Sequence, residues 1–248
     1  MKKTLIMTMG GRGGVGKTIA LVSIADYLKS KGHKIATVDC DTENADKVSA
    51  FAHWFDGKTE RLNLRNPKDC DRLLVDASSA PCDYVLTDLP ANAGGDLAEW
   101  WQDAVTSETL EELELSILAV GVITQQEGSA HSVMEWVDAL GQHVGYLVAL
   151  NRLVAERVPA PAMEAFADWH AIAPKDIAIP TFEIPHLYDE DMGTLTRLGM
   201  LPGKAIQGTN LFILPRTRVK RWRDKIHRSL DSSGLFTLNA AETLEPVS

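Results

Sequence analysis

A glycine-rich loop near the start of the chain constrains the fold more than any other segment. Residues 10–18 read Gly-Gly-Arg-Gly-Gly-Val-Gly-Lys-Thr, and from Gly11 onward they fit the pattern Gly-x4-Gly-Lys-Ser/Thr. The apolar run Leu5–Met9 predicts a strand directly before this loop, and the spacing of apolar residues predicts a helix from Lys17 to about Lys31 after it. A glycine loop between a strand and a helix predicts a phosphate-binding loop in an α/β domain.

The chemistry of this loop favours a nucleotide polyphosphate as its ligand, with Mg²⁺ beside it. Glycines let backbone N–H groups approach phosphate oxygens where a Cβ would clash, and the start of the next helix adds partial positive charge. Lys17 is expected to reach the β- and γ-phosphates, and the Thr18 hydroxyl to bind Mg²⁺. The alternative is a glycine-rich turn that binds nothing. The residues predicted to bind the nucleotide here are Gly11, Gly13, Gly14, Val15, Gly16, Lys17, Thr18 and Ile19.

Apolar, β-branched runs alternate with helical patterns along the chain, which is typical of βαβ units. We therefore predict an α/β fold of the P-loop NTPase type, with a mostly parallel twisted sheet and helices on both faces. Residues 1–230 are predicted to form one domain, and residues 231–248 a weakly ordered tail. The predicted strands are Leu5–Met9, Lys34–Asp39, Leu62–Leu64, Tyr84–Asp88, Ser116–Ile123, Tyr146–Leu150 and Ile177–Ile184. The predicted helices are Lys17–Lys31, Ala45–Phe55, Asp69–Ser78, Leu97–Val105, Ala130–Gly141, Ala160–Trp169 and Pro215–Leu230.

Aspartates end two of the predicted strands. Asp39 and Asp41 follow one apolar strand, and Asp88 ends the strand Tyr84–Asp88 in the manner of a Walker B motif. Because the carboxyl ends of parallel strands meet at one edge of a sheet, these side chains would lie beside the phosphate loop. There they are placed for Mg²⁺ and water, and Asp88 is predicted to hold the metal shell. For Asp41 the alternative is a cap on the next helix.

The loop also carries an early basic residue, in the sequence Arg12-Gly-Gly-Val-Gly-Lys-Thr. In this the chain resembles the ParA/MinD family of P-loop ATPases, whose deviant Walker A loop reads Lys-Gly-Gly-x-Gly-Lys-Ser/Thr. The resemblance implies that ATP joins two chains and that Arg12, in place of the family's lysine, reaches the partner's phosphates. Arginine keeps the charge and adds a bidentate fork, while the alternative for Arg12 is a solvated loop charge. The resemblance also implies that Asp41 orients the attacking water and that Asp39 lies nearer the metal. The predicted catalytic residues are therefore Arg12, Lys17 and Asp41. The predicted metal ligands are Thr18, Asp39 and Asp88.

Two later segments match the family's contacts with the base. Asn151 follows the strand Tyr146–Leu150, and the resemblance implies that its amide binds the adenine edge; the alternative is a turn residue. Pro185, in Ile-Pro-His, resembles the family segment that packs beside the base. The sequence lacks the Asn-Lys-x-Asp signature of GTPases, which favours ATP.

Charge is unevenly distributed along the chain. The net charge of −9 disfavours nucleic acid as a partner of the whole surface, yet residues 216–228 hold seven Lys/Arg against one acidic residue. A helix there has an apolar stripe of Val219, Trp222, Ile226 and Leu230. Three interpretations stay open: a docked helix with a solvated basic face, DNA backbone binding as in ParA relatives, and MinD-like membrane attachment, which the narrow stripe disfavours. The predicted DNA-binding residues are Arg216, Arg218, Lys220, Arg221 and Arg223.

Within the family, the stretch Arg61–Leu64 and the Ile-Pro-His-Leu region look like the plasmid-borne StbB and TraL proteins. This resemblance implies a weak Mg²⁺-dependent ATPase that dimerises on ATP binding and acts in plasmid partition, plasmid stability or DNA positioning. The expected partners are nonspecific DNA and a partner or adaptor protein. The alternative from another class is an amidoligase or synthetase of the dethiobiotin or cobyrinate type. No apolar run reaches the roughly 18 residues of a membrane span, so we expect a cytoplasmic protein that is associated with the nucleoid or a plasmid.

Overall fold

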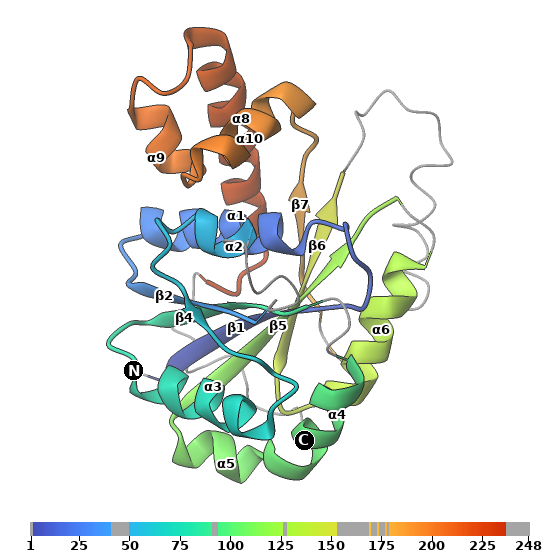
Figure 1. Cartoon of the computed structure of the whole chain (residues 1–248). Coiled ribbons are helices and arrows are strands. Elements are labelled where there is room, and N and C mark those ends of the chain that lie inside the picture. The colour runs from blue at the N-terminus through green and yellow to red at the C-terminus, as the bar shows by residue number, and fades with distance from the viewer. Residues whose placement is uncertain are drawn as a thin grey trace.

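The computed structural model describes residues 2–40, 50–90, 94–125, 128–152 and 179–236, together with 169, 173 and 177. Within them, a seven-stranded sheet has the order β3-β2-β4-β1-β5-β6-β7 (Figure 1). Each neighbouring pair of strands is parallel, which confirms the predicted α/β fold. The strands are β1 (Lys3–Met9), β2 (Ile35–Asp39), β3 (Glu60–Arg61), β4 (Tyr84–Asp88), β5 (Leu115–Ile123), β6 (Gly145–Asn151) and β7 (Thr181–Ile184).

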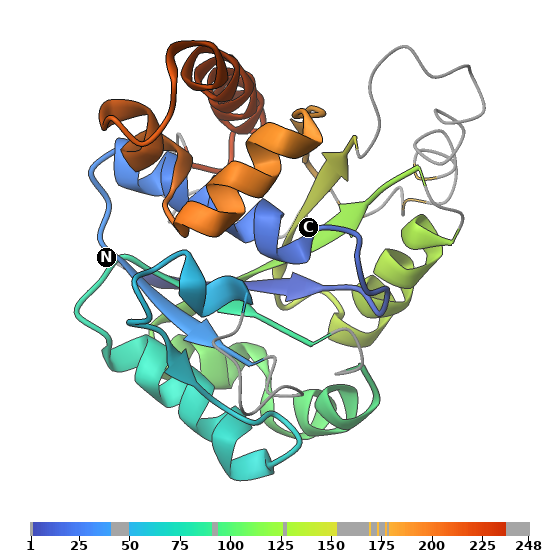
Figure 2. The same ribbon diagram turned by 45° about the horizontal axis from the view of Figure 1, so that its top comes forward.

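Helices cover both faces of the sheet, as Figures 1 and 2 show. Each layer closes its own core, and the central strands are buried on both sides, as is usual in parallel sheets. The helices of one layer are α1 (Lys17–Ser30), α2 (Ala50–His53), α8 (Asp189–Leu198), α9 (Pro202–Gln207) and α10 (Ile213–Ser232). Those of the other layer are α3 (Pro67–Ser79), α4 (Gly94–Ala104), α5 (Ser107–Glu112) and α6 (Ser129–Leu140).

The prediction of a strand over Leu62–Leu64 was wrong. The strand β3 lies two residues earlier, where Arg61 pairs with Asp39 of β2. Leu62 and Leu64 are buried, at 2% and 5% exposure, but they reach the core from a turn before α3. Leu62 still donates its N–H to the Asp39 carbonyl at 3.1 Å, but the alternation of apolar residues here reports burial beyond the end of the strand.

The segment between β7 and α10 forms two helices that the sequence patterns did not predict, and the short α5 was also missed. α8 carries acidic residues in its first turn, which the helix dipole favours, and it ends at Gly199 in the left-handed region with φ 57°. α9 starts with Pro202 in its first turn. These end signals were present in the sequence. The predicted helix Ala160–Trp169 lies outside the described residues except for Trp169, and residues 45–49 of Ala45–Phe55 lie outside them also.

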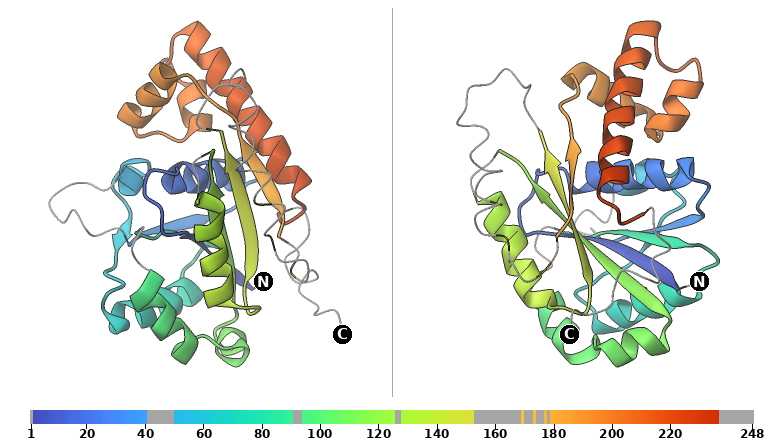
Figure 3. Two further views of the ribbon diagram at one scale, coloured as in Figure 1. Left: turned by 90° about the vertical axis from the view of Figure 1, so that its right-hand side faces the viewer. Right: turned by 180° about the vertical axis from the view of Figure 1, so that it is seen from behind.

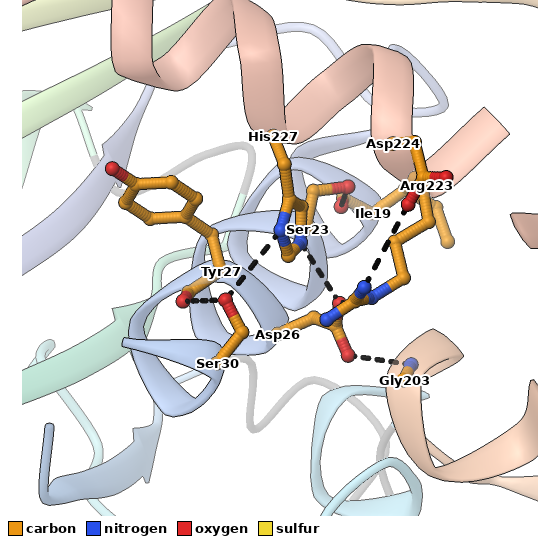
Figure 4. Close-up of polar contacts among 9 residues, drawn as sticks. All are labelled: Ile19, Ser23, Asp26, Tyr27, Ser30, Gly203, Arg223, Asp224 and His227. Atoms are coloured by element: carbon orange, nitrogen blue, oxygen red, sulfur yellow. Dashed lines mark hydrogen bonds and ion pairs between the residues drawn. The ribbon is translucent and has the colours of Figure 1, made fainter. Parts of the chain in front are cut away.

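The last helix, α10, packs on α1 and β7 (Figure 3). Its predicted apolar stripe is confirmed, because all four stripe residues are 5% exposed or less. A buried carboxylate anchors it: Asp26 of α1 accepts hydrogen bonds from Arg223 Nε at 2.5 Å and Gly203 N at 2.6 Å, and lies 3.0 Å from His227 Nε2 (Figure 4). The hydrogen bonds and the positive charge of Arg223 outweigh burial and hold the pKa of Asp26 below its usual value.

The end of α10 shifts the predicted boundary of the domain. The helix continues to Ser232, Asp231 accepts a hydrogen bond from Tyr27 at 2.7 Å, and Phe236 contacts the Tyr27 ring. The chain is therefore packed on the body past the predicted end at residue 230, and residues 237–248 lie outside the described part. Among the described helices, none combines the length and the apolar character needed to cross a bilayer.

Candidate nucleotide-binding site

The predicted phosphate loop connects β1 to α1 at the edge of the sheet where the strands end (Figure 1). Gly14 and Gly16 adopt positive φ angles of 75° and 95°, which glycine tolerates and other residues rarely adopt. A Cβ on Gly16 would collide with the amide of Asn151, whereas one on Gly14 would meet nothing within 4 Å. The loop is thus tightly braced on its inner side and open on its outer side.

Lys17 and Thr18 lie at the start of α1, as predicted. The Lys17 ammonium folds back onto the loop, where it donates to the carbonyl of Gly10 at 3.3 Å and to that of Arg12 at 2.9 Å. The Thr18 hydroxyl donates to Asp88 Oδ2 at 2.6 Å. The structure therefore brings the Walker B carboxylate, 70 residues away in the sequence, to the Thr18 hydroxyl beside Lys17.

Asp39 and Asp88 are side by side, because β2 and β4 pair these two residues in register. Both are buried, at 0% and 6% exposure. Burial raises the pKa of Asp88, and repulsion from the Asp39 carboxylate raises it further. The hydrogen bonds from Thr18 and Thr8 and the charge of Lys17 lower it. The net effect raises the pKa of Asp88 to about 6. The carboxylate of Asp39 lies 3.8 Å from Arg61 Nε. A divalent cation would relieve the repulsion between the two carboxylates.

The oxygen donors at this edge fit Mg²⁺, and the open glycine loop fits a phosphate chain. Mg²⁺ prefers oxygen ligands such as the Thr18 hydroxyl and the Asp88 carboxylate, which already lie within hydrogen-bonding distance of each other. The outer side of the loop leaves room at Gly13 and Gly14. Asp41, the predicted residue that orients water, lies outside the described residues.

Arg12 is exposed on the outside of the loop. Its guanidinium lies over Gly128, the residue that precedes α6, so that a Cβ on Gly128 would come within 2.7 Å of Nη2. The adjacent Gly11 N–H donates to Ser132 Oγ of α6 at 2.6 Å. The loop is therefore attached to α6, and the Arg12 charge stays on an accessible face.

Asn151 contacts the loop, where the sequence led us to expect contact with a base. Its Nδ2 donates to the Val15 carbonyl at 2.9 Å and the residue is 5% exposed. Pro185 accepts a hydrogen bond from Trp222 Nε1 at 2.7 Å and so joins β7 to α10. Their roles at the base stay predictions.

The basic residues of α10 divide into two groups. Arg216 donates to the carbonyl of Leu211, Arg218 binds Asp191 through two hydrogen bonds, and Arg223 binds Asp26. Lys220 and Arg221 are exposed. Three of the five predicted DNA contacts therefore have structural partners in the protein itself, and the DNA prediction rests mainly on the remaining two.

Three residues of the site were missed in the sequence. Thr8 donates to Asp88 Oδ1 at 3.2 Å and accepts from Leu89 N at 2.8 Å, which fixes the Walker B strand end. Ser132 holds the loop, and Arg61 lies beside Asp39. Thr8 is the polar residue of the otherwise apolar predicted strand Leu5–Met9, two positions before the loop, and this was a usable signal. Ser132 and Arg61 are brought in by tertiary packing and have no local signature.

Comparison with known proteins agrees with this geometry. Residues 6–208 match the CobQ/CobB/MinD/ParA nucleotide binding domain. Protein TraL of Escherichia coli is 23% identical over 242 residues, covering 93% of this chain and 98% of TraL, which confirms the expected likeness to TraL. Protein MobD of Acidithiobacillus ferrooxidans is 26% identical over 140 residues, covering 56% of this chain. The match spans only 60% of the length of MobD.

Two solved structures share the fold. A Borrelia burgdorferi protein assigned to plasmid partition and bound to AMPPNP has a TM-score of 0.52 and 14% identity, covering 96% of this chain and all of that one. Apo McdA of Cyanthece has a TM-score of 0.52 and 16% identity, covering 88% of this chain and 98% of McdA. The family match extends over most of the chain and includes both the loop and the Walker B strand, so the chain belongs to the CobQ/CobB/MinD/ParA nucleotide-binding domain family.

Proposed function

We propose that the chain is an ATP-dependent switch that dimerises on ATP binding, hydrolyses ATP weakly with Mg²⁺, and acts in plasmid partition or stability. One observation carries this proposal: two cations, Lys17 and Arg12, belong to the same glycine loop, but only Lys17 folds onto the loop's own carbonyls. Arg12 is exposed on the outer side of the loop, where its guanidinium lies over Gly128. A single nucleotide needs one of these charges, and the second is available to a nucleotide held by another chain.

The residues of the site divide the work between binding and hydrolysis. Lys17 would exchange its loop carbonyls for phosphate oxygens, while the loop N–H groups hold the phosphate chain. Thr18 and Asp88, with Asp39 beside them, would hold Mg²⁺, which neutralises phosphate charge when bound. Asp41 would orient the water, and Asn151 would keep the loop in shape from its inner side.

The wider role rests on resemblance and on surface charge. The likeness to TraL and the shared fold with a protein assigned to plasmid partition support a function on plasmids. Lys220 is exposed on α10 and could contact DNA phosphates in a dimer, where each contact is doubled. A partner or adaptor protein would then couple hydrolysis to release from DNA.

The test measures nucleotide binding and association on the same variants. Binding of a fluorescent ATP analogue should be lost in Lys17→Ala, whereas Arg12→Ala should bind the analogue but fail to dimerise with ATP in light scattering after size exclusion. Lys68→Ala, which removes an exposed charge on the opposite layer, is the matched control and should behave as wild type. If Arg12→Ala still dimerises with ATP as wild type does, the proposed role of Arg12 is wrong. Unchanged binding in Lys17→Ala would reject the site itself.

A further inference from the structure

A groove of about 1080 Å³ runs between α10 and the segment that follows β7. Figure 3 (right) shows α10 beside β7 on this side of the molecule. Its apolar lining includes Pro185, Leu187 and Trp222. The two walls are fixed to each other by the hydrogen bond from Trp222 Nε1 to the Pro185 carbonyl. The groove is therefore formed by packed elements of the fold and needs no loop to move.

The α10 wall of this groove is strongly cationic. Arg221, Lys225 and Arg228 are exposed, line the groove and follow one another at spacings of four and three residues, which places them on one face of the helix. Within the described part of the chain, no ion pair forms at any of these three side chains. Arg218 and Asp224 also line the groove, but Arg218 is bound to Asp191, and Asp224 lies 3.9 Å from Arg223.

Exposed apolar residues also lie at the start of α10, before the part of the helix that lines the groove. Phe212, Ile213 and Leu214 at the start of α10 are 87%, 75% and 67% exposed, although most large apolar residues of the described chain are buried. Leu214 lies four residues before Arg218 and so on the face of α10 that lines the groove. Contiguous exposed apolar residues next to a lined groove are typical of a protein interaction site.

We infer that the groove and the patch Phe212–Leu214 bind an acidic amphipathic segment of a partner protein. Acidic side chains of the segment would pair with Arg221, Lys225 and Arg228, and its apolar face would cover the exposed patch Phe212–Leu214. A helix laid in a groove uses both kinds of contact at once. A DNA duplex would satisfy the cations, but its phosphate surface offers no apolar cover for three adjacent large side chains. The groove and the patch would thus be the surface at which the partner protein binds, and only the biological role of that binding rests on the proposed function.

The test uses a defined probe, a fluorescein-labelled helical peptide with leucine and tryptophan on one face and glutamates spaced by four and three residues. Fluorescence anisotropy with the full chain should show binding that weakens as salt is added. Arg221→Glu should weaken binding about tenfold. Lys220→Glu is the matched control, because it makes the same change of charge at an exposed neighbour outside the groove, and it should change binding less than about twofold. Leu214→Asp should weaken binding as strongly as Arg221→Glu.

Three results would overturn the inference. Equal losses in Arg221→Glu and Lys220→Glu would mean that the peptide senses only general charge. In the second result, the chain binds a 20-base-pair duplex or phosphatidylglycerol vesicles in place of the peptide. If Arg221→Glu abolishes that binding, the groove belongs to DNA or to a membrane. A dimer that Leu214→Asp converts to monomers would mean that the patch is covered by a second copy.

A separate measurement tests the proposed function. The fluorescent ATP analogue is titrated into the wild-type chain and into Arg221→Glu, whose substitution lies outside the phosphate loop. If neither binds ATP while the peptide discriminates the variants as expected, the proposed function fails and the groove stands. If both bind ATP while the peptide does not discriminate, the groove fails alone.

Discussion

Replacing Asp88 by asparagine should stabilise the nucleotide-free protein while it removes a predicted metal ligand. Asp88 is 6% exposed, and burial beside Asp39 raises its pKa from 3.8 to about 6. A carboxyl whose pKa is raised by folding favours the native state most below its unfolded pKa, and this contribution is lost as the pH rises through the folded pKa. Between pH 4 and pH 6 the protein should therefore lose up to about 3 kcal/mol of unfolding free energy on account of Asp88.

Asparagine has nearly the same shape and cannot ionise. Its oxygen can still accept from one threonine hydroxyl, and its amide can donate to the other after that hydroxyl rotates, so the contacts with Thr8 and Thr18 can persist. The unfolding free energy of Asp88→Asn should thus exceed that of wild type by about 1–3 kcal/mol near pH 7 and by almost nothing near pH 4. Urea unfolding without nucleotide, followed by tryptophan fluorescence across this pH range, measures both values.

The control is Asp103→Asn, which removes one carboxylate from an exposed position on α4. It should shift stability by less than about 0.5 kcal/mol at every pH. If Asp88→Asn is no more stable than Asp103→Asn near pH 7, or if its advantage is the same near pH 4, the reasoning from burial is wrong. With Mg²⁺ and ATP at about 100 times the dissociation constant, wild type should gain about 2.7 kcal/mol, and Asp88→Asn should gain clearly less.

Three further substitutions test contacts that hold the site and α10. Asn151→Ala removes the donor to the Val15 carbonyl, and should weaken binding of a fluorescent ATP analogue about tenfold with a loss of about 1 kcal/mol in unfolding free energy; unchanged affinity would contradict a bracing role. Asp26→Asn should lower the unfolding free energy by about 3 kcal/mol at pH 7 and by much less near pH 3. The pKa of Asp26 is lowered by folding, so its stabilising contribution is present above the unfolded pKa and is lost as the pH falls through the folded pKa. A loss in urea unfolding that does not depend on pH would refute the ionic part. Arg218→Ala leaves the buried Asp191 without its bidentate partner and should lower the unfolding free energy in urea unfolding. An unchanged unfolding free energy would contradict a stabilising role for this ion pair.

The local parts of the fold were predictable because their signals are local. The glycine loop, the helix after it and the strand that ends in Asp88 each carry their pattern within about ten residues, and the structure places them as expected. Parallel strands then bring Asp88 beside Thr18 without any further information, since their ends meet at one edge of the sheet. Leu62 and Leu64 show the limit of this reasoning, because their alternation reports burial, whereas the strand itself is Glu60–Arg61.

The parts that were missed depend on contacts between distant residues. Nothing in the sequence around Asn151 indicates that its amide holds a carbonyl 136 residues away in the phosphate loop. Arg218 and Arg223 similarly resemble free basic residues of a DNA-binding helix until the structure places a buried aspartate against each of them. Charge counted along a helix cannot distinguish a cation that stabilises the fold from one that is available to a partner.

The helix α1 connects these two kinds of site, and the connection has a physical consequence. Its first residues, Lys17 and Thr18, belong to the phosphate loop and the metal edge, and Asp26, two turns later, holds α10. A helix of this length is nearly rigid, so a shift of its first turn is carried to Asp26, whose bonds to Arg223 tolerate little change in distance. The binding of phosphates at one end and the position of the basic helix at the other therefore share one structural element, and the sequence, which predicts α1 and α10 separately, gives no sign that a buried carboxylate joins them.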